Sequence, residues 1–357
     1  MTLQILGLGT AVPQHSMSQA EATDLARQVI CRTEQQERML RVLYRKAGVE
    51  NRQTVLPHRI ALDWLTDERA VTPGPTTAER MGFYAEHAPP LARQAAQAAL
   101  ETSGVERGDI THLVTVSCTG FGAPGIDTAL LTGLELSPTT QRIQVGFMGC
   151  HGAINGLRVA QALATADPAA RVLLCAVELC SLHYRFAWDP ERIVANALFA
   201  DGAAALVGGG AIPHGGNAWQ VAATGSCLLP DSTDAMSWHI GDHGFEMTLA
   251  ARAPDLIQQH LRPWLTAWLA QQGQRLENIR SWAIHPGGPR ILSAIEECLN
   301  LPREATAISR EVLAQNGNMS SPTVLFILDR LRAGGAERPC VALGFGPGMF
   351  AEGALFI

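Results

Sequence analysis

Charged residues and long apolar runs are both scarce in this sequence of 357 residues. Charged residues make up 17% and hydrophobic residues 47%, the reverse of a disordered composition. The 27 Lys and Arg residues are outnumbered by 33 Asp and Glu residues, so the net charge is −6. That balance argues against a nucleic-acid-binding surface, which normally carries a basic stripe. No run of about 18 apolar residues is present, so no membrane-spanning helix is expected. The N-terminus lacks the basic region of a signal peptide.

Cysteine, by contrast, is plentiful. The eight cysteines stand at positions 31, 118, 150, 175, 180, 227, 298 and 340. They are dispersed through the chain and lack the paired spacing of a zinc site. Without secretory features, such cysteines are normally free thiols in a reducing compartment, so we expect a cytoplasmic location and no metal.

The order of predicted elements repeats once along the chain. Apolar runs predict strands at residues 3–8, 112–117, 143–148, 171–179 and 203–207, and then at 219–223, 281–284, 340–345 and 352–357. Helical patterns occupy residues 19–30, 91–100, 154–164 and 257–269, and further helices are expected from 289 and from about 318. Residues 57–90 are expected to be irregular, and residues 239–243 to form a loop. Alternating strands and helices predict an α/β fold, with residues 1–210 and 211–357 as two similar halves.

Cys150 is a candidate nucleophile. It follows an apolar strand and precedes a helix, with small residues on both sides. A helix N-terminus favours an anion and can lower a thiol pKa from about 8.5 toward 7 or below. The alternative is a buried structural cysteine, the commonest fate of a free thiol.

His285 and Asn318 are the candidate partners of Cys150. His285 follows a predicted strand, at the carboxyl end where α/β sheets place their sites, although it could be an ordinary loop histidine. Asn318 could simply cap the helix that follows it. In the repeat, Cys150 and Asn318 head corresponding helices, which would bring them together. A Cys, His and Asn set suits acyl transfer, because imidazole and amide groups can stabilise the oxyanion formed when a thiolate attacks a thioester.

Several longer motifs accompany these residues. They are Thr119-Gly120-Phe121 with Pro124, Gly149-Cys150, Ala197-Leu198-Phe199-Ala200-Asp201-Gly202-Ala203-Ala204, Ile284-His285-Pro286-Gly287-Gly288-Pro289, Gly317-Asn318-Met319-Ser320-Ser321 and Gly344-Phe345-Gly346-Pro347-Gly348. With these motifs, nearly the whole chain resembles the type III polyketide synthases of the chalcone and stilbene synthase superfamily, in a bacterial-type form.

The resemblance implies a thiolase-like, five-layered αβαβα fold and a homodimer. Cys150 would take a starter acyl group from coenzyme A. His285 and Asn318 would bind the malonyl-CoA thioester carbonyl and stabilise the enolate formed on decarboxylation, and His285 would help to hold Cys150 as a thiolate. Repeated extension and cyclisation would give an aromatic or pyrone product, including the alkylresorcinol and alkylpyrone types. CoA thioesters would be the substrates, and no other cofactor is implied.

The resemblance also assigns the walls of the cavity. Phe199 matches the family's gatekeeper phenylalanine, and the second gatekeeper position falls on Met247. Trp238 stands where chalcone synthases have a small glycine, so it should narrow the cavity or redirect the chain. The small residues around Cys118 and Ala123 leave room for a longer aliphatic starter. The residues expected to line the cavity are Cys118, Cys180, His183, Trp238, Ser320, Phe345 and Pro347, each of which could instead be core packing.

Cations are needed for the phosphates of CoA. Arg45 and Lys46 belong to a basic stretch in a region that meets these phosphates in the family, and Arg290 follows the His-Pro-Gly-Gly-Pro turn. Each could equally lie on a solvated helix face.

Two other functions remain open. One is a single-round beta-ketoacyl synthase III-like condensing enzyme. The other is a non-catalytic thiolase-fold protein that binds acyl-CoA, although such proteins usually lose the nucleophile. A degradative thiolase is disfavoured, because it would need a second cysteine in the glycine-rich loop at residues 344–348.

Overall fold

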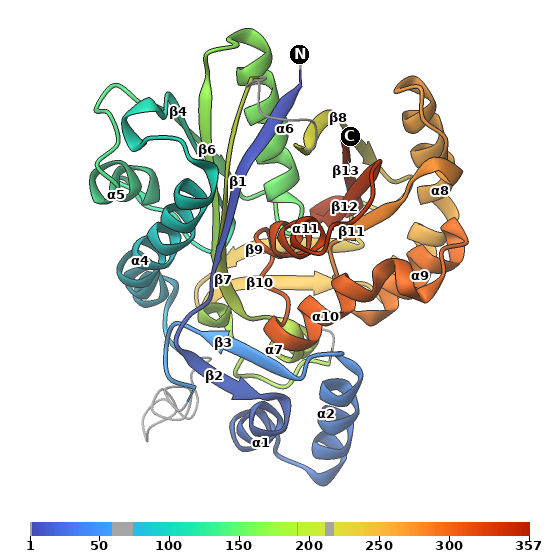
Figure 1. The fold of residues 1–357 in the computed structure, drawn as a ribbon. Coiled ribbons are helices and arrows are strands. Elements are labelled where there is room, and N and C mark those ends of the chain that lie inside the picture. Colours follow the sequence, from blue (N-terminus) through green and yellow to red (C-terminus); the bar gives the residue numbers. More distant parts are fainter. Residues whose placement is uncertain (1, 59–73, 191, 211–217) are drawn as a thin grey trace.

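A large mixed sheet covered by helices forms the body of the molecule (Figure 1). The computed structural model describes residues 2–58, 74–190, 192–210 and 218–357. The strands are β1 (Leu3–Ala11), β2 (His15–Ser18), β3 (Asn51–Thr54), β4 (His112–Ser117), β5 (Gln141–Gly146), β6 (Arg171–Leu179), β7 (Asp201–Gly209), β8 (Gln220–Leu228), β9 (Met236–Gly241), β10 (Gly244–Leu249), β11 (Ser281–Ile284), β12 (Cys340–Gly346) and β13 (Phe350–Phe356). The helices are α1 (Gln19–Ile30), α2 (Glu34–Lys46), α4 (Thr77–Ser103), α5 (Ile126–Gly133), α6 (Gly152–Ala166), α7 (Ile193–Leu198), α8 (Ala253–Gln271), α9 (Pro289–Leu299), α10 (Ala307–Asn316) and α11 (Thr323–Ala333). Among these helices, none combines the length and apolarity needed to cross a membrane.

The sheet consists of two parts with the same connectivity. Its strand order is β11-β12-β13-β8-β1-β7-β6-β4-β5. In one part β1–β7 and β7–β6 are antiparallel and β6–β4 is parallel, and in the other β8–β13, β13–β12 and β12–β11 repeat these senses. The two parts meet where Leu3 pairs with Val221 and Gln4 with Gln220. The repeated element order expected from the sequence is therefore present in the sheet.

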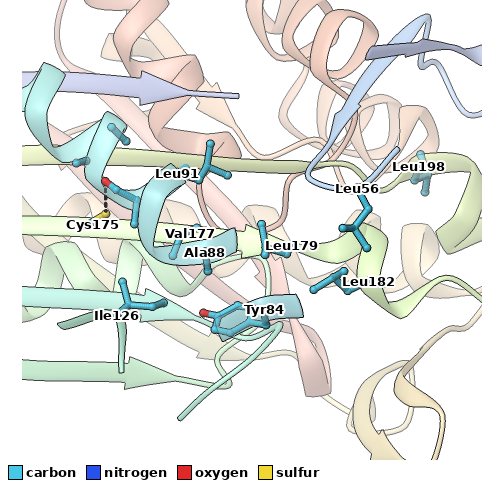
Figure 2. Close-up of a cluster of buried hydrophobic side chains, with 14 of the residues drawn as sticks. Leu56, Tyr84, Ala88, Leu91, Ile126, Cys175, Val177, Leu179, Leu182 and Leu198 are labelled. Carbon is cyan, nitrogen blue, oxygen red and sulfur yellow. Dashed lines mark hydrogen bonds between the residues drawn. The ribbon is translucent and has the colours of Figure 1, made fainter. Parts of the chain in front are cut away.

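Helices cover both faces of each part of the sheet. In β6, Leu173, Cys175 and Val177 point to one core, and Val172, Leu174 and Ala176 point to another. The first core lies under α4 and α5, and Figure 2 shows Tyr84 and Leu91 of α4 in it. The second contains α6 and α11, and α6 contacts strands of both parts. A third core joins β11–β13 to α8 and α9. The layers are helix, sheet, helix, sheet, helix, which confirms the predicted αβαβα fold.

Helix α4 begins inside the segment that was expected to be irregular. Thr76 accepts from the backbone N–H of Glu79, and the Glu79 side chain accepts from the backbone N–H of Thr76, which forms a capping box. Pro89 and Pro90 each remove one helical hydrogen bond, yet the helix continues through them. Packing of its buried face on the sheet outweighs that loss. The expectation was wrong from residue 77 onward, and residues 59–73 lie outside the described residues.

A separate hairpin forms where a loop was expected. Strands β9 and β10 pair antiparallel and make a two-stranded sheet of their own, with Met247 opposite Trp238. Only the short connection between Gly241 and Gly244 is a turn. The hairpin matters because it carries one wall of the site described next.

Candidate active site

Cys150 sits in a tight connection between β5 and α6. Phe147 and Gly149 both have positive φ (60° and 79°), so the chain turns sharply before the thiol. A Cβ on Gly149 would collide with the ring of Pro347, so glycine is required there on steric grounds as well. Helix α6 starts at Gly152, which leaves Cys150 just outside its first turn.

His285 follows β11 and is held by its backbone, not by its ring. Its backbone N–H donates to the carbonyl oxygen of Leu343 at 2.8 Å. The residue is 1% exposed, and both ring nitrogens are buried without a hydrogen-bond partner in the described part of the chain. An imidazole left unpartnered in a dry site is free to bind a reacting group.

Asn318 is held beside Phe199 by backbone pairing. Its N–H donates to Leu198 O (2.8 Å) and its carbonyl accepts from Ala200 N–H (3.0 Å). The side-chain Oδ1 accepts from the N–H of Ser320 at 2.8 Å, so the amide N–H₂ is the end left to donate. The alternative role of Asn318, as the cap of the next helix, is excluded because Pro322 stands at that position. Ser320 has φ +57°, which breaks the helical path, and α11 begins only at Thr323.

The three candidate residues line one cavity. This cavity holds about 430 Å³ of empty space. It is lined by Cys150, Leu198, Phe199, Met236, Met247, Leu249, His285, Gly287, Ile291, Asn318 and Phe345. A second cavity of about 350 Å³ also has Cys150 in its wall. It is lined by Cys118, Thr119, Gly149, Cys150, Cys180, Phe199, Met236, Ser237, Trp238, Met247, Ser320 and Pro347.

A third, larger chamber adjoins the first two. It holds about 930 Å³ of empty space, counting the part open to solvent, and His183 lies in its wall. Cys180 and Trp238 belong both to this chamber and to the second cavity. Phe199 and Met247 line all three spaces. These two side chains therefore stand at the junction between the spaces.

Burial controls the charge of the central pair. It raises the pKa of Cys150 to about 11, against hydrogen bonds from Ser320 and Asn318 that lower it. Burial also lowers the pKa of His285 to about 3, and nearby His151 adds to that effect. The sequence predicted a thiol pKa lowered by the helix N-terminus. The loss of hydration that a thiolate would suffer on burial has a larger effect on the pKa than the electrostatic field of the helix N-terminus. Cys150 is therefore a thiol, and it lies beside a neutral imidazole.

Glu178 at the end of β6 is an important residue that the sequence analysis missed. It is fully buried and accepts from the backbone N–H groups of Cys118 (2.9 Å) and Thr119 (3.0 Å) and from the Ser321 hydroxyl (2.5 Å). It thus joins the loop after β4 to the segment that carries Asn318. A lone acidic residue in an otherwise apolar strand was the signal that could have identified it.

The β9–β10 hairpin is attached to the site by two side chains. Trp238 Nε1–H donates to the carbonyl of Cys118 at 2.7 Å. His183 Nε2 donates to Thr119 O (2.7 Å), while its Nδ1 accepts from the N–H of Phe245 (2.9 Å). This arrangement requires a neutral ring, and burial lowers the pKa of His183 to about 3. His183 therefore links the β9–β10 hairpin to the loop after β4, and it also lines the largest of the three cavities described here.

The three candidate CoA-binding cations lie outside these cavities. Arg45 and Lys46 are exposed at the end of α2, and Arg290 is exposed in the first turn of α9. The two helix ends are neighbours, because a Cβ on Gly48 would lie 2.6 Å from Cγ of Pro289. Among the described residues, no group of three or more His, Cys, Asp or Glu side chains could hold a metal ion.

Comparison with known proteins identifies the family. Residues 2–212 match the N-terminal domain of chalcone and stilbene synthases, and residues 220–357 match the C-terminal domain. The alpha-pyrone synthesis polyketide synthase-like Pks18 of Mycobacterium tuberculosis is 34% identical over 99% of this chain and 90% of its own. The 1,3,6,8-tetrahydroxynaphthalene synthase of Streptomyces peucetius is 33% identical over 98% of this chain and 91% of its own.

Solved structures agree with these matches. PKS-I from the brown alga Ectocarpus siliculosus superimposes with a TM-score of 0.90 at 30% identity, over 99% of this chain and 98% of its own. The C-terminal type III polyketide synthase domain of Steely1 from Dictyostelium gives a TM-score of 0.92 at 27% identity, over 100% and 99%.

Fold and comparisons together define an acyltransferase with a thiolase-like architecture. The chain belongs to the chalcone and stilbene synthase family. It is a type III polyketide synthase, an enzyme that condenses malonyl-CoA units with decarboxylation, as the sequence predicted.

Proposed function

We propose that Cys150 carries the acyl chain. Its sulfur would attack the thioester carbon of the starter acyl-CoA, a new C–S bond would form, and the bond to CoA sulfur would break. The proton lost by Cys150 would pass to the departing CoA thiolate through His285. The observation that carries this proposal is the convergence of Cys150, His285 and Asn318 on one cavity, with both imidazole nitrogens unpartnered.

His285 and Asn318 would then activate malonyl-CoA. Loss of carbon dioxide leaves an enolate, whose negative oxygen needs donors in a dry site. The Asn318 amide is suited to donate because Ser320 occupies its oxygen. The enolate carbon would attack the acyl-Cys150 thioester, forming a C–C bond while the bond from the acyl carbon to the Cys150 sulfur breaks. The extended chain, now a CoA thioester, would be transferred back to Cys150 for the next round, with release of CoA.

The cavity walls would set the product. Phe199 and Met247 would act as gatekeepers, and Met247 is the more adaptable of the two because methionine is flexible. We propose an aromatic or pyrone product, of the alkylresorcinol or alkylpyrone type with a longer aliphatic starter. The small side chain of Cys118 and the α-pyrone synthesis for which Pks18 is named support this choice.

The substrates, domain division, oligomeric state and location of the enzyme form part of the same proposal. CoA thioesters would be its only small-molecule requirement, with Arg45, Lys46 and Arg290 near the phosphates. The division into halves would fall at residues 210/211, which the repeated strand order supports. We further propose a homodimer in the cytoplasm. A cytoplasmic location is supported by the free state of all eight cysteines.

A product screen tests the proposal. Purified enzyme would receive malonyl-CoA with starters from acetyl-CoA through long-chain acyl-CoAs to coumaroyl-CoA, followed by mass analysis. Products with two or more malonyl-derived units are expected, and Cys150→Ala should abolish them. Cys227→Ala is the matched control, because that thiol lines none of the three cavities in the described structure.

Each other outcome selects a different function. Products of a single extension would favour the beta-ketoacyl synthase III-like alternative. Full activity in Cys150→Ala would exclude the proposed nucleophile. Absence of both product and acylated Cys150 would favour a non-catalytic acyl-CoA-binding protein.

A further inference from the structure

Arg52 of β3 is a buried arginine that takes no part in the proposed steps. Only 5% of the residue is exposed, and a buried cation is costly unless hydrogen bonds surround it. Its Nη1 donates to the carbonyl oxygens of Asn196 (2.6 Å) and Phe199 (3.1 Å). Its Nη2 donates to the carbonyl oxygen of Ala197 (2.7 Å) and to the side chain of Gln19. Three of these four acceptors belong to one short stretch of main chain.

The bonds from Arg52 complete the end of helix α7. The last carbonyl oxygens of a helix have no partner within the helix, and buried ones need a donor from elsewhere. The carbonyl oxygen of Ala195 accepts from the N–H of Phe199 (2.9 Å), and that of Leu198 accepts from the N–H of Asn318 (2.8 Å). The guanidinium supplies donors for the carbonyl oxygens at positions 196, 197 and 199. The main chain around the Phe199 ring is therefore held by Arg52 and by Asn318 together.

The same stretch of chain fixes the position of Asn318. Asn318 forms backbone hydrogen bonds to the residues on both sides of Phe199. A Cβ on the preceding Gly317 would lie 3.0 Å from the carbonyl oxygen of Leu198 and 3.6 Å from Cβ of Arg52. Arg52 thus lies against the segment that carries Asn318 as well as the one that carries Phe199. A shift of the carbonyl groups that it binds would move both residues.

We propose that Arg52 is a positioning residue for the extension step, holding Phe199 and Asn318 in the geometry that malonyl-CoA requires. The inference rests on the proposed function, from which the roles of these two residues come. Buried carbonyl oxygens left without donors are costly, so loss of the guanidinium would make the chain between α7 and β7 rearrange. A displacement of about 1 Å in a group that positions a substrate can slow a reaction on the order of 100-fold.

Loading of Cys150 should depend much less on Arg52. The turn before Cys150 packs on Pro347, and the backbone N–H of His285 is bonded to the carbonyl oxygen of Leu343. These contacts involve neither β3 nor α7. The attack of Cys150 on the starter should therefore survive a change at Arg52, whereas condensation, which needs the enolate donor, should not. An arginine with a purely structural role would affect both steps alike.

Single-turnover rates separate the two steps. Enzyme would first receive dodecanoyl-CoA alone, and acylation of Cys150 would be followed by intact-protein mass spectrometry. Malonyl-CoA would then be added, and the appearance of extended products gives the rate of extension. In Arg52→Met, which keeps the length of the side chain without its donors, we expect extension to slow by about 10–100-fold and loading to change by less than about threefold. Arg52→Lys keeps the charge but not the planar fork of donors, so it should slow extension less than Arg52→Met does.

Arg80 of α4 provides a matched control. It is also fully buried, and its guanidinium donates to the carbonyl oxygens of Pro75 (2.9 Å) and Leu182, both outside α7. Arg80→Met should lower the urea midpoint as Arg52→Met does, because each variant leaves buried carbonyl oxygens without donors. The ratio of its extension rate to its loading rate should nevertheless stay within about twofold of the wild type.

A free cation should replace the lost guanidinium. Arg52 lines the chamber of about 930 Å³, part of which is open to solvent, so a small solute can reach the place of its side chain. Guanidinium chloride at about 20 mM should raise the extension rate of Arg52→Ala by about threefold or more, whereas the same concentration of sodium chloride should not. Arg80→Ala should gain nothing in extension rate from either salt.

Two results would overturn the positioning role. One is an unchanged extension rate in Arg52→Met. The other is equal slowing of loading and extension in the Arg52 variants, without rescue by guanidinium, which would leave Arg52 a purely structural residue. If Arg52→Met does not fold, Arg52→Lys and the rescue of Arg52→Ala decide between these outcomes. Failure of the wild type to form any extended product would instead contradict the proposed function.

Discussion

Cys150 of the resting enzyme should behave as a buried thiol, because His285 beside it is neutral. With a pKa of about 11, only about one molecule in 10⁴ would be a thiolate at pH 7, compared with about 3% for an ordinary thiol of pKa 8.5. Cys150 in the wild type should therefore react with iodoacetamide on the order of 300-fold more slowly than an ordinary thiol at pH 7. Its rate should rise about tenfold per pH unit, without a plateau below about pH 11.

His285→Ala should give nearly the same pH profile, because the neutral imidazole is not among the groups that set the pKa of Cys150. The alkylation rates of the two proteins at pH 7 should therefore agree within about twofold. The assay follows the Cys150 peptide by mass spectrometry from about pH 5 to about pH 10. The partly exposed Cys227 serves as an internal reference in the same samples. A wild-type rate about 100-fold or more above that of His285→Ala at pH 7 would refute the neutral pair and show that His285 holds Cys150 as a thiolate.

Two further predictions concern the walls and the frame of the site. Trp238→Ala should open the cavity of about 350 Å³ to the chamber of about 930 Å³. The products, analysed by mass, should then contain more malonyl-derived units. An unchanged product profile would show that the indole does not separate the two spaces. Glu178→Gln should replace one of the two carboxylate oxygens, which accept from Thr119 and Ser321 respectively, with an N–H₂ group that cannot accept, and lower the free energy of unfolding by roughly 2–4 kcal/mol. Urea unfolding measures this loss, and an unchanged midpoint would contradict the structural role.

Much of the fold could be predicted because strong local patterns coincide with the final structure. The apolar run at 171–179 became β6 with the same bounds, and the helical pattern at 19–30 became α1. Patterns of this kind depend on neighbours in the chain. The hairpin at 236–249 was missed because Trp238 and Met247 face the cavity while His239 and Ile240 are exposed, which leaves no clear apolar strand pattern.

In the candidate site, too, features that depend on distant parts of the chain could not be predicted. The residue types and spacing identified Cys150, His285 and Asn318 as candidates, and the structure brings them to one cavity. The conformation of Asn318 could not be predicted, because it depends on pairing with Phe199, a residue more than a hundred positions earlier. The charge state of Cys150 was likewise mispredicted. The local helix field is visible in the sequence, whereas the burial that outweighs it comes from the whole fold.

The separate hairpin divides the protein into a part that performs chemistry and a part that shapes the product. Cys150, His285 and Asn318 all belong to connections of the αβαβα body, whereas Trp238 and Met247 belong to a two-stranded sheet outside the large one. Substitutions in residues 236–249 can therefore remodel the cavity without displacing the nucleophile. Chains of this architecture can diverge in product while they retain one reaction, and exchange of this hairpin between relatives offers a direct way to redesign the product.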